Sequence, residues 1–151
     1  MRNLKKGFTL IELLVVIAII GILATTLAPK LREQLAKAKD SVAISLLGAA
    51  RTASGVLFTE KLIETTSSVS IVATDLEKKL DDKSQELFGS DGSAVPIGGT
   101  RDSDGGDVTY GGTIKMVVTS TSGAVNFGDT TQGTTSPAGT YSVENKVWKN
   151  Y

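Results

Sequence analysis

The chain has 151 residues, which is enough for one modest domain and an additional N-terminal segment. Its 16 basic and 16 acidic side chains balance, and this neutrality provides no electrostatic footprint for binding nucleic acid. Cysteine and histidine are both absent, which excludes disulfides, the usual nucleophile–base pairs and the usual transition-metal sites. We therefore do not expect an enzyme.

Residues 8–28 form an apolar run in which Glu12 is the only charged side chain. As a helix this run spans about 32 Å, close to the ~30 Å hydrocarbon thickness of a bilayer. Arg2, Lys5 and Lys6 precede it, so the positive-inside rule predicts a cytoplasmic N-terminus. A carboxylate in such a segment costs on the order of 2.5–3.5 kcal/mol at the bilayer centre and less near an end. Glu12 therefore needs a cationic partner, which the segment itself does not supply.

The run begins with a specific motif, Gly7-Phe8-Thr9-Leu10-Ile11-Glu12. Over about residues 5–30 the sequence resembles the class III signal and first helix of bacterial type IV pilins and type II secretion pseudopilins. The resemblance implies that a prepilin peptidase removes residues 1–7 by cutting after Gly7 and methylates the new amine of Phe8. It also implies that Glu12 pairs with the Phe8 amine of a neighbouring subunit during filament assembly, which would supply the missing cation. Without residues 1–7, thirteen basic side chains would face sixteen acidic ones.

Two simpler interpretations of the N-terminal run explain it less well. An ordinary secretory signal has a shorter apolar core and a small-x-small cleavage site, but here the run is longer and no Ala-x-Ala follows it. A plain single-span anchor explains the length of the run, although it explains neither Glu12 nor the Gly7–Phe8 junction.

Apolar residues continue at helical spacing beyond the run, while charged residues occupy the other faces. The spacing predicts one helix that ends near residue 59, with a membrane and assembly half over 8–29 and an amphipathic half over 30–59. We expect the apolar stripe of the second half to face a domain packed on it. The stripe comprises Leu31, Leu35, Ala38, Val42, Leu46, Ala49, Ala53 and Val56.

Gly21 and Pro29 interrupt the helical pattern. Glycine costs about 1 kcal/mol relative to alanine in a helix, and proline removes one main-chain hydrogen bond. The simpler interpretation is a kink that a membrane segment tolerates, with the hydroxyls of Thr25 and Thr26 bonding the freed carbonyls. The family resemblance implies more, namely that residues 21–29 lose helical structure in the filament and act as an extensible joint.

Residues 60–107 are predicted as a connecting segment, and residues 108–151 as an antiparallel sheet. Thr74-x-x-Glu77 matches a capping box and predicts a helix over about 75–88, ended by Gly89. Strands are predicted over 108–110, 113–119, 124–127, 139–143 and 147–151, with tight turns at Gly111-Gly112 and Ser122-Gly123. The fold class is therefore α+β and pilin-like, a long N-terminal helix packed against a small sheet. The expected core residues of the sheet are Tyr110, Met116, Val118, Val125, Phe127, Tyr141, Val143 and Trp148.

Four aspartates, Asp91, Asp102, Asp104 and Asp107, gather in the glycine-rich stretch before the sheet. Calcium prefers six to eight oxygen ligands of this kind. Asp102-x-Asp104 begins like an EF-hand loop, but Thr113 stands where the closing glutamate belongs. A solvated turn is the favoured interpretation, and no cofactor is expected.

The sequence thus favours a structural subunit of a type IV pilus, held in the inner membrane and then polymerised into a surface filament. The resemblance implies as partners other copies of the chain, the prepilin peptidase, and an inner-membrane assembly platform with its ATPases. A type II secretion pseudopilin is the first alternative, and a membrane-tethered carbohydrate- or protein-binding module is the second. Twitching, adhesion, DNA uptake and secretion are not distinguished by these residues.

Overall fold

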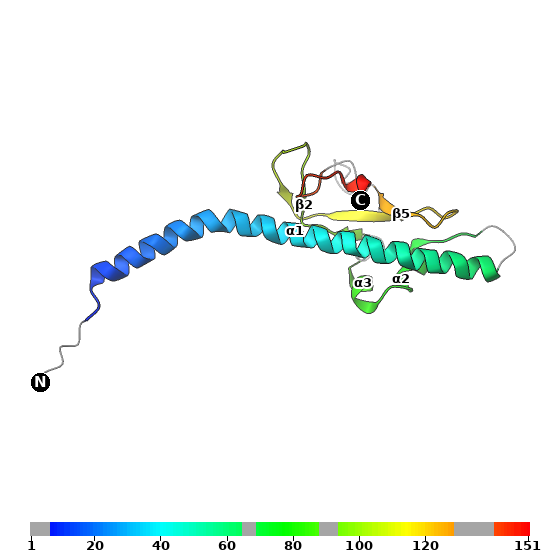
Figure 1. Cartoon of the computed structure of the whole chain (residues 1–151), viewed down its shortest axis with the longest axis horizontal. Coiled ribbons are helices and arrows are strands. Elements are labelled where there is room, and N and C mark those ends of the chain that lie inside the picture. The colour runs from blue at the N-terminus through cyan, green and yellow to red at the C-terminus, as the bar shows by residue number, and fades with distance from the viewer. Residues whose placement is uncertain (1–6, 65–68, 88–93, 129–140) are drawn as a thin grey trace, which may run out of the picture. The chain divides into compact units, whose positions relative to one another are not determined.

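The structure is a computed structural model that describes residues 7–64, 69–87, 94–128 and 141–151 (Figure 1). The chain divides into two compact units, residues 1–34 and residues 35–151. Four features predicted above lie wholly or partly outside the described residues: the leader before Gly7, the helix end at Gly89, the aspartate at position 91, and the first two residues of the strand predicted over 139–143.

Helix α1 (Leu10–Glu64) is the dominant element, and a small antiparallel sheet follows it in the chain (Figure 1). This confirms the predicted α+β architecture with a long N-terminal helix and a small sheet. The helix ends at Glu64, five residues after the predicted position.

The first unit contains the apolar part of α1. Its large side chains are exposed all round, from 45% for Val16 to 80% for Leu10. An 18-residue window of α1 has a mean hydropathy of 2.7, so by length and composition the helix is able to cross a membrane. An apolar surface of this kind needs lipid or other apolar helices to cover it.

The helix continues through Gly21 and Pro29. Because proline has no N–H, the carbonyl of Thr25 loses its usual donor four residues on. The hydroxyl of Thr25 donates to the carbonyl of Ile22 at 2.9 Å, and that of Thr26 donates to the carbonyl of Leu23 at 2.9 Å. The two hydroxyls thus bond carbonyls three and two residues before the carbonyl that Pro29 frees, which corrects the predicted partners.

In the second unit, a three-stranded sheet has the order β1 (Ala94–Pro96), β4 (Thr113–Val118), β5 (Val125–Gly128), with all neighbours antiparallel. A two-stranded sheet pairs β2 (Gly99–Thr100) with β3 (Thr109–Tyr110). The turn predicted at Ser122-Gly123 joins β4 to β5, and Gly123 adopts a φ of 68° there. The first strand begins at Ala94, inside the segment predicted as connecting.

The turn predicted at Gly111-Gly112 is not a hairpin turn, because the strands on its two sides pair with different partners. Instead, residues 94–100 run antiparallel to residues 109–118, and the pairing changes sheet at these glycines. Gly111 N–H donates to the carbonyl of Gly98 at 2.7 Å, and Ile97 N–H donates to the carbonyl of Gly112 at 3.0 Å. The φ angles of 85° and 117° allow the bend, since glycine has no Cβ to clash.

The helix predicted over 75–88 is wrong as a single element. The chain forms two one-turn helices, α2 (Ala73–Glu77) and α3 (Asp82–Glu86). The N-cap of α2 is Val72 and makes no side-chain capping bond, so the capping box expected from Thr74 is wrong as well. Ion pairs attach this segment to the end of α1, between Lys61 and Asp75 at 2.7 Å and between Lys79 and Glu60 at 2.8 Å.

The sheet and the second part of α1 share one core, but a different helix face from the predicted one is buried. Only Leu46 of the predicted stripe is buried. The buried face was not predicted from apolar periodicity because it includes two polar side chains, Asp40 and Ser54. That face comprises Ala36, Asp40, Ala43, Leu46, Leu47, Ala50, Ser54 and Leu57.

The last predicted strand, 147–151, is also wrong, because residues Trp148–Asn150 form the 3-10 helix η2. The indole of Trp148 turns into the core and packs edge-on against Phe127, with 5.4 Å between ring centroids. Tyr141 forms only isolated bridges, with Arg101 and Val147. Met116, Val125, Phe127, Val143 and Trp148 are buried as predicted, whereas Tyr110 is 44% exposed and does not belong to the core.

Candidate functional site

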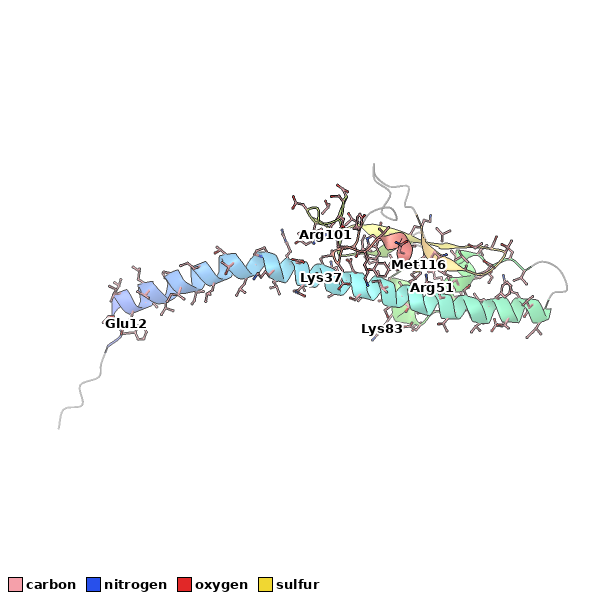
Figure 2. The ribbon with its side chains drawn as sticks, turned by 45° about the horizontal axis from the view of Figure 1, so that its top comes forward. Glu12, Lys37, Arg51, Lys83, Arg101 and Met116 are labelled. Atoms are coloured by element: carbon pink, nitrogen blue, oxygen red, sulfur yellow. The ribbon has the colours of Figure 1, made fainter. Side chains whose placement is uncertain are left out.

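Glu12 lies in the first turn of α1 (Figure 2). Its carboxylate accepts hydrogen bonds from Thr9 of the same chain. The main-chain N–H of Thr9 donates to Glu12 Oε2 at 2.9 Å, and the Thr9 hydroxyl donates to the same oxygen at 2.7 Å. The main-chain N–H of Glu12 in turn donates to the Thr9 hydroxyl oxygen at 3.3 Å. This reciprocal pattern is a capping box, which satisfies two of the helix's unpaired N–H groups.

The capping box at Thr9 was not predicted, although its signal was in the sequence. Thr9-x-x-Glu12 directly precedes an apolar run, as the motif requires. The prediction that the segment supplies no cation for Glu12 is unaffected, because both of Thr9's donors are neutral. The carboxylate nevertheless has hydrogen-bond donors within its own chain.

Gly7 and Phe8 precede this cap outside the helix, and both are exposed. The peptide bond between them is therefore accessible, as a cleavage site must be. Phe8 lies four residues before Glu12 in the sequence, and Gly21 and Pro29 lie further along the helix that contains Glu12.

In the loop before β3, Asp104 and the neighbouring main chain are held by Asn145 and Arg101. The side-chain amide of Asn145 donates to Asp104, and the amide oxygen of Asn145 accepts from Gly105 N–H at 2.9 Å. The guanidinium of Arg101 donates to the carbonyl of Gly106 in the same loop. Among the described residues, no group of three or more acidic side chains is placed to hold a metal ion.

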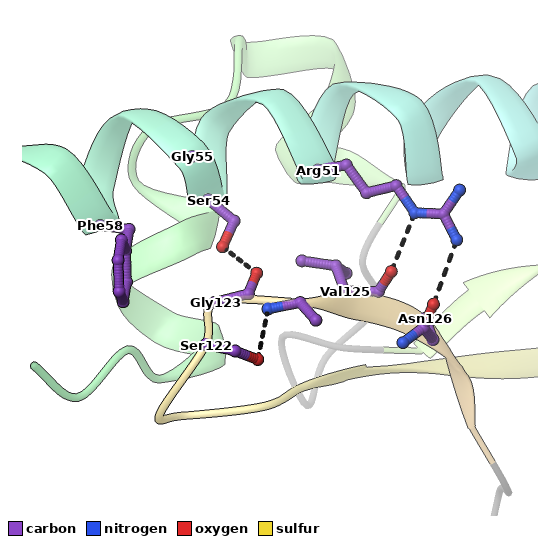
Figure 3. A pocket seen from close by; sticks show the side chains of 9 residues that line it. Arg51, Ser54, Gly55, Phe58, Ser122, Gly123, Val125 and Asn126 are labelled. Carbon is purple, nitrogen blue, oxygen red and sulfur yellow. Dashed lines mark hydrogen bonds between the residues drawn. The ribbon is translucent and has the colours of Figure 1, made fainter.

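The β4–β5 hairpin is fastened to α1 beside an open hollow of about 370 Å³ (Figure 3). Arg51 donates from Nε to the carbonyl of Val125 at 2.9 Å and from a terminal nitrogen to the side-chain oxygen of Asn126 at 3.1 Å. Ser54 donates to the carbonyl of Gly123. The polar groups that border the hollow thus serve to hold the hairpin on the helix.

Asp40 is a buried carboxylate on the face of α1 that the sheet covers, with 2% of its surface exposed. It accepts a hydrogen bond from Gly98 N–H at 2.8 Å and another from Val143 N–H at 3.0 Å. Burial raises the pKa of Asp40, the amides of Val143, Gly98 and Gly99 oppose this, and the charge of Glu144 adds to it. Asp40 was not predicted as a buried residue, because a single aspartate among the many charged residues of this half of α1 carries no distinguishing signal.

Residues 2–28 match the family model described as "Prokaryotic N-terminal methylation motif". Over 53 residues the chain is 49% identical to a type IV major fimbrial protein, FimA, of Dichelobacter nodosus, covering 35% of this chain and 34% of that protein. It is 41% identical over 61 residues to the fimbrial protein EcpC of Eikenella corrodens, covering 40% of each. It is 54% identical over 46 residues to the type IV major pilin protein PilE1 of Neisseria gonorrhoeae, covering 30% of this chain and 28% of that protein.

The matched part spans only about a third of the length of these curated relatives. No solved structure matches the chain significantly. The chain carries the prokaryotic N-terminal methylation motif, and its N-terminal third is similar to those of type IV fimbrial and pilin proteins.

Proposed function

We propose that this chain is the structural subunit of a type IV pilus. In this proposal a prepilin peptidase cuts between Gly7 and Phe8 and methylates the Phe8 amine. Before assembly the apolar part of α1 anchors the subunit in the inner membrane. The subunit polymerises when the helices of several copies pack together. The single observation that carries the proposal is a carboxylate, Glu12, at the start of an apolar helix whose large side chains are exposed in the described part of the chain.

The electrostatics of Glu12 favour assembly over simple anchoring. A carboxylate near the membrane gains most from an ammonium group, because opposite charges attract strongly where water is scarce. In this proposal the free amine of Phe8 of a neighbouring subunit supplies that charge. The pair forms only when the two helices are offset by one step along the filament, so Glu12 sets the register.

The second part of α1 supports self-association independently. Leu35, Val42, Val56 and Ile63 are exposed and are separated by multiples of seven residues. A seven-residue spacing places apolar side chains along one face of a helix, as in helices that pack against other helices. The chain's own core buries a different face and reaches this line of residues at Ala49, which is partly buried, so the four exposed side chains remain open to a further copy.

The pilin interpretation has more support than the pseudopilin alternative. The relatives described above are named as fimbrial and pilin proteins, and the shared part includes the motif that the proposal uses. The assembly platform, its ATPases and a surface location after assembly follow from the same proposal. We further propose a non-enzymatic role without a metal cofactor, so that a chelator leaves the melting temperature of the head unchanged.

Electron microscopy of filaments sheared from cells tests the proposed function. Wild-type cells should shed long filaments made of this chain. Glu12→Ala should leave the membrane level of the subunit unchanged and remove the filaments, whereas Glu33→Ala, which changes a carboxylate beyond the apolar run, should keep them. Normal filaments from Glu12→Ala would contradict the pairing, and a protein that remains monomeric in detergent would favour the tethered binding module.

A further inference from the structure

We propose that Thr9 is a positioning residue for filament assembly, which holds Glu12 ready for the neighbouring subunit's amine. This inference rests on the proposed function and names a residue that the function did not use. Its basis is the three hydrogen bonds that join Thr9 and Glu12.

The two carboxylate oxygens of Glu12 differ in their partners: Oε2 accepts the hydrogen bonds from Thr9, and Oε1 does not. Both donors of Thr9 converge on Oε2, and within the described part of the chain no donor bonds Oε1. A carboxylate oxygen accepts more than one hydrogen bond, and the two oxygens accept independently. Oε1 is therefore open to an ammonium group while Thr9 continues to hold Oε2.

The same contacts lower the cost of keeping Glu12 in the membrane before assembly. A buried charged group without hydrogen-bond partners is strongly disfavoured, and a charge-assisted bond to a carboxylate is among the stronger ones. All three bonds use atoms of Thr9 and Glu12 alone, so removal of residues 1–7 takes none of them away. The acid thus stays oriented from membrane insertion until a second copy arrives.

Fixing the side chain in advance also favours the assembly step itself. An unrestrained glutamate loses rotamer freedom when it forms an ion pair, whereas a side chain already held by Thr9 has lost it beforehand. Removal of the threonine hydroxyl should therefore weaken subunit addition without preventing insertion or cleavage.

Four variants at two positions separate positioning from simple helix capping. Thr9→Val keeps the branched shape and removes the hydroxyl, and Thr9→Ser keeps the hydroxyl. Thr9→Gly removes the hydroxyl but remains within a few tenths of a kcal/mol of threonine as a helix cap. Thr26→Val, which removes a hydroxyl that bonds only carbonyls of its own helix, is the matched control.

The readout is the yield of sheared filaments divided by the amount of cleaved, methylated subunit in the membrane, both measured by mass spectrometry. We expect Thr9→Val and Thr9→Gly to lose roughly fivefold or more of this yield, the factor that corresponds to the loss of one hydrogen bond of average strength between the Thr9 hydroxyl and Glu12. Thr9→Ser and Thr26→Val should match the wild type. If Thr9→Gly gives the wild-type yield while Thr9→Val loses yield, Thr9 acts only as a helix cap and the inference is wrong. Wild-type yield from both variants would also overturn it. Loss of filaments in Glu12→Ala is measured in parallel, in a separate strain and by the same assay. If the Thr9 variants assemble normally while Glu12→Ala does not, the inference about Thr9 fails but the proposed function stands.

Discussion

The carboxylate of Asp40 on α1 accepts a hydrogen bond from the main-chain N–H of Val143 at 3.0 Å, across 103 residues of sequence. Its other oxygen accepts from Gly98 N–H, so one buried side chain joins the helix to two separate segments of the head. Each of these amides is buried away from water and needs an acceptor. The attachment of the sheet to the helix thus depends on a polar residue within an otherwise apolar face.

Asp40→Ala should destabilise the head, because it leaves two buried N–H groups without an acceptor at a cost of ~1–3 kcal/mol each. Asp40→Asn should cost less, since its one carbonyl oxygen still serves one amide. Chemical unfolding of the full chain in detergent micelles measures this through the fluorescence of Trp148, the single tryptophan. Asp107→Asn, at an exposed aspartate of the head, is the control and should leave the unfolding midpoint unchanged.

The stability of the head should also depend on pH through Asp40. The folded pKa of this carboxyl is raised, chiefly by burial, above the ordinary value of about 3.9. The native state therefore holds a proton that the unfolded chain releases, so this contribution is full below pH ~3.9 and is lost as pH rises through the raised value. We expect the unfolding free energy of the wild type to fall over this window relative to that of Asp40→Asn. A constant difference between the two proteins from pH 3 to 7 would show that Asp40 does not titrate in this way.

Gly98→Ala should separate the sheet from the helix. A Cβ at this position would lie 1.9 Å from the carbonyl oxygen of Ala36, so the main chain must move and the bond to Asp40 must lengthen. Overpacking of this kind costs roughly 1–3 kcal/mol.

Gly48→Ala is the matched control for that substitution. Apart from the adjoining main chain of α1, nothing lies within 4 Å of the place that a Cβ at Gly48 would take, and alanine is the better helix former by about 1 kcal/mol. We expect its unfolding midpoint to rise slightly while that of Gly98→Ala falls. Equal midpoints for the two variants would contradict the close approach at Ala36.

Pro29→Ala should stiffen the filament if residues 21–29 act as its extensible joint. Alanine restores the N–H that the carbonyl of Thr25 lacks, so the helix gains one hydrogen bond and resists opening. Force–extension measurements on single filaments should show less extension at a given force, and circular dichroism of the subunit should show higher helicity. Filaments of Gly48→Ala, a substitution outside the joint, should extend like those of the wild type. If filaments of Pro29→Ala also extend like the wild type, Pro29 does not contribute to an extensible joint.

The sequence predicted the features that local pattern and charge determine. The apolar run, the position of Glu12, the long helix and the β4–β5 hairpin all follow from composition, helical periodicity and turn residues over short stretches. Met116, Val125 and Phe127 were placed correctly because alternation along a strand identifies its buried side.

The failures arose where distant contacts decide the outcome. The buried face of α1 includes Asp40 and Ser54, whose partners lie at Gly98, Gly123 and Val143, far away in the sequence. Trp148 was expected in a strand, but its indole packs in the core beside Phe127, and residues Trp148–Asn150 form a 3-10 helix. The capping box at Thr9, by contrast, has a local signal in the sequence, Thr9-x-x-Glu12, that was not predicted as a helix start.

The mass of the N-terminal peptide of the protein purified from its native cells tests the central claim most directly. We predict a chain that begins at Phe8 and carries one methyl group on its amine, the group that Glu12 of the next subunit is proposed to bind. A protein that begins at Met1 would have no amine at Phe8, and that result would contradict assembly through this pair.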